Sequence, residues 1–214
     1  MMDDGNATNH GDAEELPVPV PAELRFRGAE PADAKAVAGL HTDSWQRHYR
    51  GAFSDAFLDN EVAGYQRERW KGRLAAPDPR ARTILAELDG VVVGFAHTIL
   101  GDDPTWGSLL DNLHVQYGLK RHGIGTRLMG LTARTVLAEA PSSGLYLWVL
   151  EQNTGARAFY TARGGECVER VPVPSAGHPD RLTGEPFSLR IVWRDPSVLA
   201  SGGGEDDRAA GPSG

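Results

Sequence analysis

The sequence predicts a mixed α/β (α+β) fold in which helices cover both faces of one mostly antiparallel sheet of six to seven strands. Three observations support this prediction. Strand and helix patterns alternate along the chain, Asp89-Gly90 gives a strong hairpin signal, and residues 145–150 form an apolar run without the alternation of a half-exposed strand. The resulting order β, α, α, β, β, β, α, β, α, β, β implies helices on both sides of the sheet.

The first half of the domain is predicted to hold a short strand, two helices and a three-stranded meander. Pro31 occupies a position where a missing N–H costs a helix nothing, and apolar spacing continues this helix to about His48. A second helix is expected over 61–74, which leaves 50–61 as a loop. The strands are expected at 24–28, 82–88, 91–100 and 106–115.

The second half is predicted to alternate helices with strands. A helix is expected at 123–138, ending before Pro141. The apolar strand at 145–150 follows, and its composition indicates burial on both faces. The remaining elements are a helix at 154–162 and strands at 167–171 and 187–193.

Length and composition fit a single domain with two tails. The chain has 214 residues, of which 40% are hydrophobic, enough for one core of ordinary size. Residues 1–22 are acidic and then Pro-rich, and residues 196–214 are Gly-rich and charged. We therefore expect one domain over 23–195 between two disordered tails.

Charge and residue usage exclude several classes of function. A formal net charge of -7 argues against nucleic-acid binding, which needs a surplus of Lys and Arg. Cys167 is the single cysteine, so no intramolecular disulfide can form. No apolar run is long enough to span a membrane, and the histidines lack metal-ligand spacing. The sequence favours a soluble cytoplasmic protein without a metal, and leaves open whether it is a monomer or a homodimer.

The most informative segment is a strand-to-helix connection around residue 120. A strand is expected to end at Val115 and a helix to begin near Gly123, so backbone N–H groups of 121–126 should point out of a helix N-terminus. Glycines 123 and 125 would let a diphosphate approach the backbone closely. Side-chain donors at the rim would be Lys120, Arg121 and His122. The glycine pair alone is weak evidence, and it matches neither the dinucleotide fingerprint nor a P-loop.

Two blocks of the sequence resemble one known family. Leu113-x-Val115, followed by Lys120-x-x-Gly123-x-Gly125 opening a helix, resembles motif A of the GNAT N-acetyltransferases. A second block, Leu147-x-Val149-x-Glu151-x-Asn153-x-x-Ala156-x-x-Phe159-Tyr160-x-x-x-Gly164, resembles motif B. The resemblance covers 24–193. The sequence departs from the family pattern at Lys120, where Gln or Arg is usual, and at Tyr117, where Pro is common.

The resemblance implies acetyl-CoA as the acyl donor, held in a cleft where two strands splay apart. It implies that the pantetheine arm bonds to the backbone of Leu113, His114 and Val115. It places the pyrophosphate at Lys120, Arg121, His122, Gly123, Ile124, Gly125 and Thr126. It also implies that Asn153 contacts the arm, a role compatible with capping the next helix, and that Tyr160 is the general acid that protonates the departing thiolate. The alternative for Tyr160 is an ordinary core aromatic residue.

Acceptor-side residues follow less directly. In a regular strand 109, 111, 113 and 115 share one face. The resemblance implies a general base at the positions of Leu109 or Asp111, which makes Asp111 the candidate, although a solvated strand-edge carboxylate is an equal alternative. By the same alternation His114 should point away, and His97 is a weaker candidate. Trp45 and Tyr49 are four residues apart and face together on one helix. The resemblance implies that they help wall the acceptor site, and the alternative for Trp45 is packing alone.

The sequence therefore predicts acetyl transfer from acetyl-CoA to a primary amine, with a small molecule as the favoured acceptor. Acetylation of a protein lysine or N-terminus is one alternative, and a non-catalytic acyl-CoA-binding regulatory module is another. A peptide acceptor would need an open groove beside the loops at 50–61 and 175–185.

Overall fold

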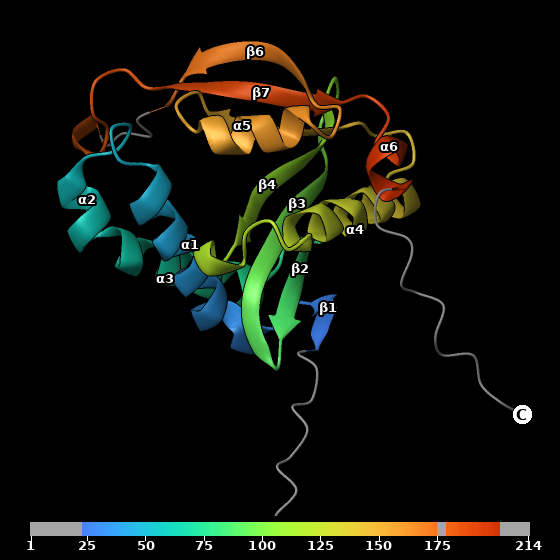
Figure 1. Cartoon of the computed structure of the whole chain (residues 1–214), viewed down its shortest axis with the longest axis horizontal. Helices are drawn as coiled ribbons and strands as arrows, with labels where there is room; N and C mark the ends of the chain where they lie inside the picture. The colour runs from blue at the N-terminus through green and yellow to red at the C-terminus, as the bar shows by residue number, and fades with distance from the viewer. Residues whose placement is uncertain (1–22, 175–178, 202–214) are drawn as a thin grey trace, which may run out of the picture.

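The computed structural model describes residues 23–174 and 179–201, which fold around one seven-stranded sheet of order β1-β2-β3-β4-β5-β7-β6 (Figure 1). The strands are β1 (Leu24–Gly28), β2 (Ala81–Leu88), β3 (Val91–Asp103), β4 (Gly107–Val115), β5 (Leu145–Leu150), β6 (Glu166–Pro172) and β7 (Phe187–Trp193). The helices are α1 (Ala34–His48), α2 (Asp55–Asn60), α3 (Val62–Ala75), α4 (Ile124–Glu139), α5 (Thr154–Thr161) and α6 (Ser197–Ala200). All strand pairs are antiparallel except β4 with β5, so the predicted mixed, mostly antiparallel fold is confirmed.

Helices cover the two faces of the sheet through separate apolar clusters. On one face Val37 of α1 and Trp70 of α3 pack with Leu85 and Phe95. On the other, Leu128 of α4 belongs to a larger cluster that extends through β5 and β7 to Tyr160 of α5. Burial of apolar surface on both faces is the main stabilising contribution to such a layered domain.

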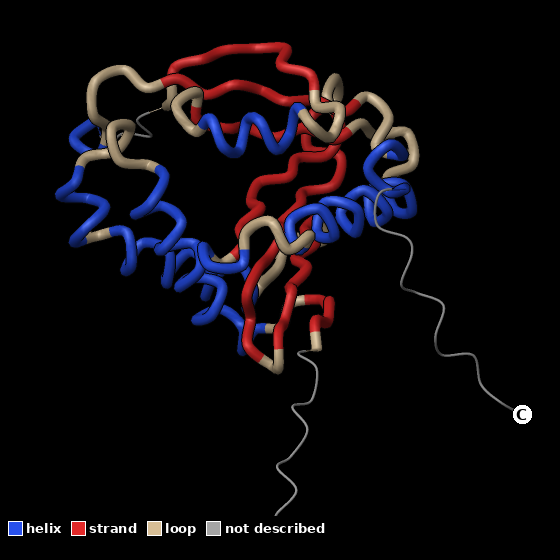
Figure 2. The backbone as a smooth tube through the Cα atoms, in the orientation of Figure 1, coloured by secondary structure: helices blue, strands red, loops and turns tan. Residues whose placement is uncertain are grey.

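The sheet opens between its two central parallel strands (Figure 2). β4 and β5 pair only at Ser108 with Leu145 and at Leu109 with Tyr146, and beyond these pairs they diverge. A Cβ at Gly107 would lie 2.3 Å from the carbonyl oxygen of Gly144, so the contact at the closed end requires glycine. The splayed arrangement implied by the resemblance is present.

A β-bulge in β4 corrects the expected alternation of side chains. The register with β3 shifts between His97, opposite Asn112, and Thr98, opposite Leu110, so Asp111 is the extra residue. Asp111 and His114 consequently both contact helices of the α1/α3 face. The prediction that 109, 111, 113 and 115 share a face is wrong, and so is the prediction that His114 points away from Asp111.

Two short helices were not expected from the sequence. The segment 50–61 contains α2, whose N-cap Ser54 accepts a hydrogen bond from the Phe57 N–H. The predicted disordered tail from 196 begins too early, because α6 places Leu199 against α4 with 6% of its surface exposed. Residues 1–22 and 202–214 lie outside the described residues. None of the described helices is long and apolar enough to cross a membrane.

Candidate active site

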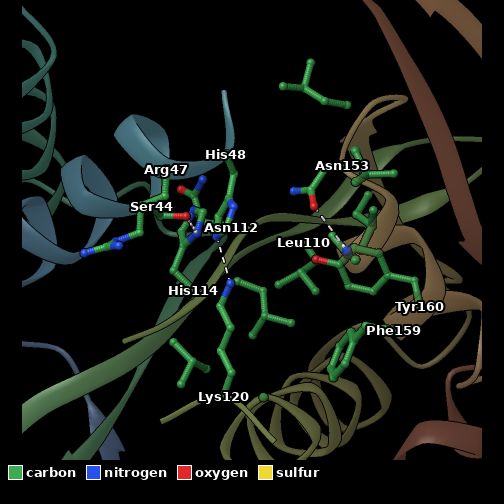
Figure 3. Close-up of a pocket in the computed structure, with 18 of the residues that line it drawn as sticks. Ser44, Arg47, His48, Leu110, Asn112, His114, Lys120, Asn153, Phe159 and Tyr160 are labelled. Atoms are coloured by element: carbon green, nitrogen blue, oxygen red, sulfur yellow. Dashed lines mark hydrogen bonds between the residues drawn. The ribbon is translucent and has the colours of Figure 1, made fainter. Parts of the chain in front are cut away.

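A cavity of about 1030 Å³ occupies the opening between β4 and β5 (Figure 3). Its walls come from the C-terminal part of α1, from β4, the 119–126 loop, β5 and α5. Several basic side chains line it: Arg47, His48, Arg50, Lys120, Arg121 and Arg163. Asp111 is the one carboxylate among the described lining residues. The volume suits an elongated ligand, and the charge suits an anionic one.

The loop before α4 presents backbone N–H groups to one end of the cavity. Gly123 has φ of 78°, a left-handed conformation that favours glycine, and Arg121 has φ of 69°. The first helical bond runs from the Arg127 N–H to the Gly123 carbonyl, so the N–H groups before it have no partner within the helix. A Cβ at Gly125 would meet the Phe159 ring at 3.4 Å, which leaves little room for a larger residue.

Basic side chains at the mouth of the cavity are held by Tyr117. The Lys120 ammonium lies 5.1 Å from the centroid of the Tyr117 ring and the Arg47 guanidinium lies 4.8 Å from it. Lys120 Nζ also donates to Nε2 of His48 at 2.7 Å. Burial and then the positive charge of Lys120 lower the pKa of His48, which favours the neutral ring that accepts this bond. Tyr117, which departs from the family pattern, thus positions the equally unusual Lys120.

Arg163 is a cavity residue that the sequence analysis did not identify. Its guanidinium lies 3.6 Å from the centroid of the Phe159 ring and donates to the Thr126 hydroxyl at the start of α4. Its Nε is buried without a hydrogen-bond partner, and burial lowers the pKa of the side chain. The sequence carried little signal for it, because Arg163 lies beyond the end of α5, where helical spacing from Tyr160 no longer applies.

Tyr160 and Asn153 stand at the two ends of α5 and both line the cavity. Asn153 caps the helix, with Oδ1 accepting from the Ala156 N–H at 3.2 Å. Tyr160 is 8% exposed and makes edge contacts with Phe159 and Trp193. Burial, and then the neighbouring Tyr49, raises the pKa of Tyr160 above its ordinary value, so the phenol keeps its proton at neutral pH.

Asp111, on the β4 wall of the cavity, lies between two arginines of α3. Arg73 Nη1 donates to Oδ2 of Asp111 at 2.6 Å, and Arg69 Nη2 donates to the same oxygen at 3.2 Å. Burial acts to raise the pKa of Asp111, but the charges of Arg73 and Arg69 outweigh it and the pKa lies below its usual value. Asp111 is therefore ionised at neutral pH and is a weaker base than a free carboxylate.

Tyr49 lies close enough to both Asp111 and Tyr160 for their charges to interact. Its ring stacks on Trp45 with centroids 4.7 Å apart, and it lines the cavity, whereas Trp45 lies behind it among Phe53, Phe57 and Tyr65. Burial and then the charge of Asp111 raise the pKa of Tyr49 to about 12. Tyr49 in turn raises the pKa of Tyr160, so the three groups are electrostatic neighbours across the cavity floor.

Three neutral histidines lie on this side of the sheet, and His97 and His114 are close enough to Asp111 to feel its charge. His114 lines the cavity, with Nδ1 2.8 Å from the Ser44 hydroxyl, and its pKa is lowered to about 3 by burial and then by His48. His97 lies 2.7 Å from the Thr83 hydroxyl with its pKa lowered to about 4, and it does not line the cavity. His41 accepts a bond from Trp70 Nε1 at 2.9 Å and is also held neutral by burial.

The cavity brings together most of the residues predicted from the sequence. Their side chains or backbone line it at Tyr49, Asp111, Leu113, His114, Val115, Lys120, Arg121, Gly123, Gly125, Thr126, Asn153 and Tyr160. Trp45, His122 and Ile124 do not line it: His122 bonds to the Lys120 carbonyl, and Ile124 packs into the core. Within the described residues, no group of three or more His, Cys, Asp or Glu side chains could hold a metal ion.

Comparisons with known proteins agree with this geometry. Residues 37–164 match the acetyltransferase (GNAT) family. A probable N-acetyltransferase of Mycobacterium tuberculosis is 31% identical over 146 residues, covering 65% of this chain and 78% of that protein. An uncharacterized N-acetyltransferase of Bacillus subtilis is 27% identical over 178 residues, covering 82% of this chain and 96% of that protein.

The fold is also shared with a solved structure, the PaiA N-acetyltransferase of Thermoplasma acidophilum in complex with coenzyme A. The two agree with a TM-score of 0.61 at 17% identity, over 78% of this chain and 98% of that one. The family match spans both sides of the opening between β4 and β5 and includes the loop before α4. The chain therefore belongs to the acetyltransferase (GNAT) family.

Proposed function

We propose that this acetyltransferase moves the acetyl group of acetyl-CoA directly to a primary amine of a small molecule. The donor supplies the acetyl group as a thioester, which an uncharged amine can attack without a covalent enzyme intermediate. The observation that carries the proposal is that one cavity is lined by the loop before α4, by the ionised Asp111 and by Tyr160.

The donor half of the cavity fits a coenzyme A diphosphate. Backbone N–H groups of 121–126, the Lys120 ammonium and the Arg163 guanidinium can donate to phosphate oxygens. Leu113, His114 and Val115 present the edge of β4 that β5 leaves unpaired, which can bond to an extended amide-containing arm as a strand would. Asn153 adds a side-chain amide to the same wall.

Tyr160 is the proposed general acid. Its phenol is protonated at neutral pH and lies on the cavity wall, so it can give a proton to the sulfur as the thiolate departs. Asp111 is the proposed partner of the incoming amine. Two arginines keep it ionised, and through its other oxygen it can attract the ammonium form and receive the proton that the amine loses.

The loops beside the acceptor end support a small molecule over a peptide. The segment before α2 is tied across to the loop between β6 and β7: Phe53 forms an isolated bridge with Leu182, and the Ser54 N–H donates to the Arg181 carbonyl at 2.8 Å. The Thr183 N–H donates to the Ala52 carbonyl at 3.0 Å. An extended peptide would need these two loops apart, because it would lie in the groove between them. Because hydrogen bonds join the two loops, the site favours a compact acceptor over an extended peptide.

The test is release of free thiol from acetyl-CoA by the full chain with a panel of small amines and, separately, peptides with free N-termini or lysines. We expect turnover with small amines and little with peptides. Turnover confined to peptides would establish the protein-acetylating alternative. Tight acetyl-CoA binding without thiol release from any acceptor would instead support a non-catalytic binding module.

The role of Asp111 has its own readout in the pH dependence of kcat/KM. If Asp111 accepts the proton, Asp111→Asn should flatten the acid limb of the profile, whereas Asp111→Glu should restore part of it. An acid limb that is identical in wild type and Asp111→Asn would remove Asp111 from proton transfer.

A further inference from the structure

Beside the cavity, two arginines of α3 carry an excess of positive charge that the amine itself does not explain. Neither arginine lines the cavity, but both contact Asp111, which does. Arg69 and Arg73 both bond to one oxygen of Asp111, so two guanidiniums share a single negative charge. Arg69 makes no other hydrogen bond within the described residues, and 23% of its side chain is exposed. Arg73 also contacts Oδ1 of Asn112 at 3.4 Å, and 30% of its side chain is exposed. Both guanidiniums are reachable from solvent and have donors to spare.

The charge of the two arginines also acts on neighbouring groups. The charges of Arg69 and Arg73 contribute to lowering the pKa of both His41 and His97, after burial, and Arg69 does so for His114. These histidines are neutral and add no charge of their own. Asp111 is the only carboxylate among the described residues that line the cavity, so the field is not cancelled from the opposite wall.

Another arginine beside the cavity is not available in the same way. Arg50 lines the cavity but is bonded to Asp55 at 2.6 Å and Asp59 at 2.5 Å, so its charge is more than balanced. The net positive charge therefore belongs to the α3 pair. It contrasts with the net charge of -7 of the whole chain, which would by itself favour a cationic acceptor.

We propose that the acceptor is an amine that also carries a carboxylate, with the carboxylate bound by Arg69 and Arg73 of α3 and the amine directed toward Tyr160. This inference rests on the proposed function and narrows it to amino acids and related amino-carboxylates. Guanidinium forks match a planar carboxylate, and a substrate that arrives with its own negative charge balances the second arginine. Asp111 holds the two guanidiniums in place before the acceptor binds.

The experiment compares matched acceptors that differ only in the carboxylate. The pairs are ornithine with putrescine and phenylalanine with phenethylamine, and the readout is kcat/KM for thiol release from acetyl-CoA by the full chain. In each pair that the enzyme acetylates, kcat/KM for the amino-carboxylate should exceed that for the decarboxylated amine by at least about tenfold. A difference of this size is the effect of one charge-assisted interaction. Equal or better use of the decarboxylated amines would overturn the inference while leaving amine acetylation intact. No thiol release with either member of any pair, or with any other small amine, would count against the proposed function itself.

Variants of α3 assign the preference to particular residues. Arg69→Gln and Arg73→Gln should reduce the preference for the carboxylated member toward unity, mainly by raising its KM, and Arg→Lys at the same positions should recover part of it. The matched control is Arg67→Gln, an exposed position on the same helix, which should leave the preference unchanged. Melting temperatures of all variants identify any that fail to fold. If folded Arg69→Gln and Arg73→Gln enzymes keep the wild-type preference, the carboxylate is bound elsewhere.

Discussion

The two ends of the cavity are built in different ways. The end proposed to bind the acyl donor, the donor end, is formed largely by backbone: a left-handed Gly123, the N–H groups of the loop before α4 and the unpaired edge of β4, all from one continuous segment. The end proposed to bind the amine, the acceptor end, is formed by side chains from α1, α3 and β4. A backbone site tolerates side-chain exchange but not an added Cβ where none fits, whereas a side-chain site can change its ligand through single substitutions.

The largest expected effect is at the donor end. Gly123→Glu or Gly125→Glu should abolish measurable coenzyme A binding, because a carboxylate would occupy the helix N-terminus and position 123 has φ of 78°. Isothermal titration with coenzyme A measures this. Gly64→Glu on α3, where a Cβ meets nothing within 4 Å, is the control and should bind normally. Unchanged affinity in the 123 and 125 variants would place the diphosphate elsewhere.

At the junction of the two ends, Tyr160→Phe should lower turnover by about 100-fold while acetyl-CoA affinity changes little, the effect of losing a positioned proton donor. The ring contacts with Phe159 and Trp193 are retained, so stability should hold. Tyr146→Phe is the control, because that hydroxyl bonds to Asp102 outside the cavity. If the Tyr160→Phe enzyme keeps wild-type turnover at every pH, under conditions where the chemical step limits the rate, Tyr160 is not the general acid.

A smaller effect is expected at the mouth of the donor end, where side chains assist the backbone. Tyr117→Leu removes the ring that faces Arg47 and Lys120, and should weaken coenzyme A binding about fivefold, equivalent to about 1 kcal/mol. The loss should shrink as salt is added. A change as large as that of the glycine variants would show that side chains, rather than backbone, dominate the donor end.

At the acceptor end the buried histidines should make stability depend on pH. The pKa of His97 is about 4 and that of His114 about 3, both below the ordinary value of 6.5. The unfolded chain therefore binds more protons, so stability is full above pH 6.5 and is lost progressively as pH falls toward these values. Thermal unfolding from pH 7.5 to 4.5 checks the slope, which His97→Asn should reduce and His122→Asn should not. A melting temperature that is constant across this range would contradict the prediction.

The same contrast explains what the sequence could predict. The strands, the major helices and the donor loop follow from apolar periodicity, the Asp89-Gly90 turn and glycine spacing, which are local signals. The acceptor end depends on a bulge at Asp111 that alternation cannot anticipate, and on two arginines brought from another element. The i, i+4 spacing of Arg69 and Arg73 was visible, but nothing in the sequence links them to residue 111.

The separation of β4 from β5 gives the protein two strand edges in the middle of its sheet. An exposed edge exchanges its amide hydrogens rapidly and can pair with any extended chain, including another copy of the same protein. Coenzyme A bound along β4, as proposed, would take the place of that missing neighbour. Purified protein should therefore aggregate more slowly in the presence of coenzyme A than in its absence. Amide hydrogen exchange at 110–115 should also be slower with coenzyme A bound.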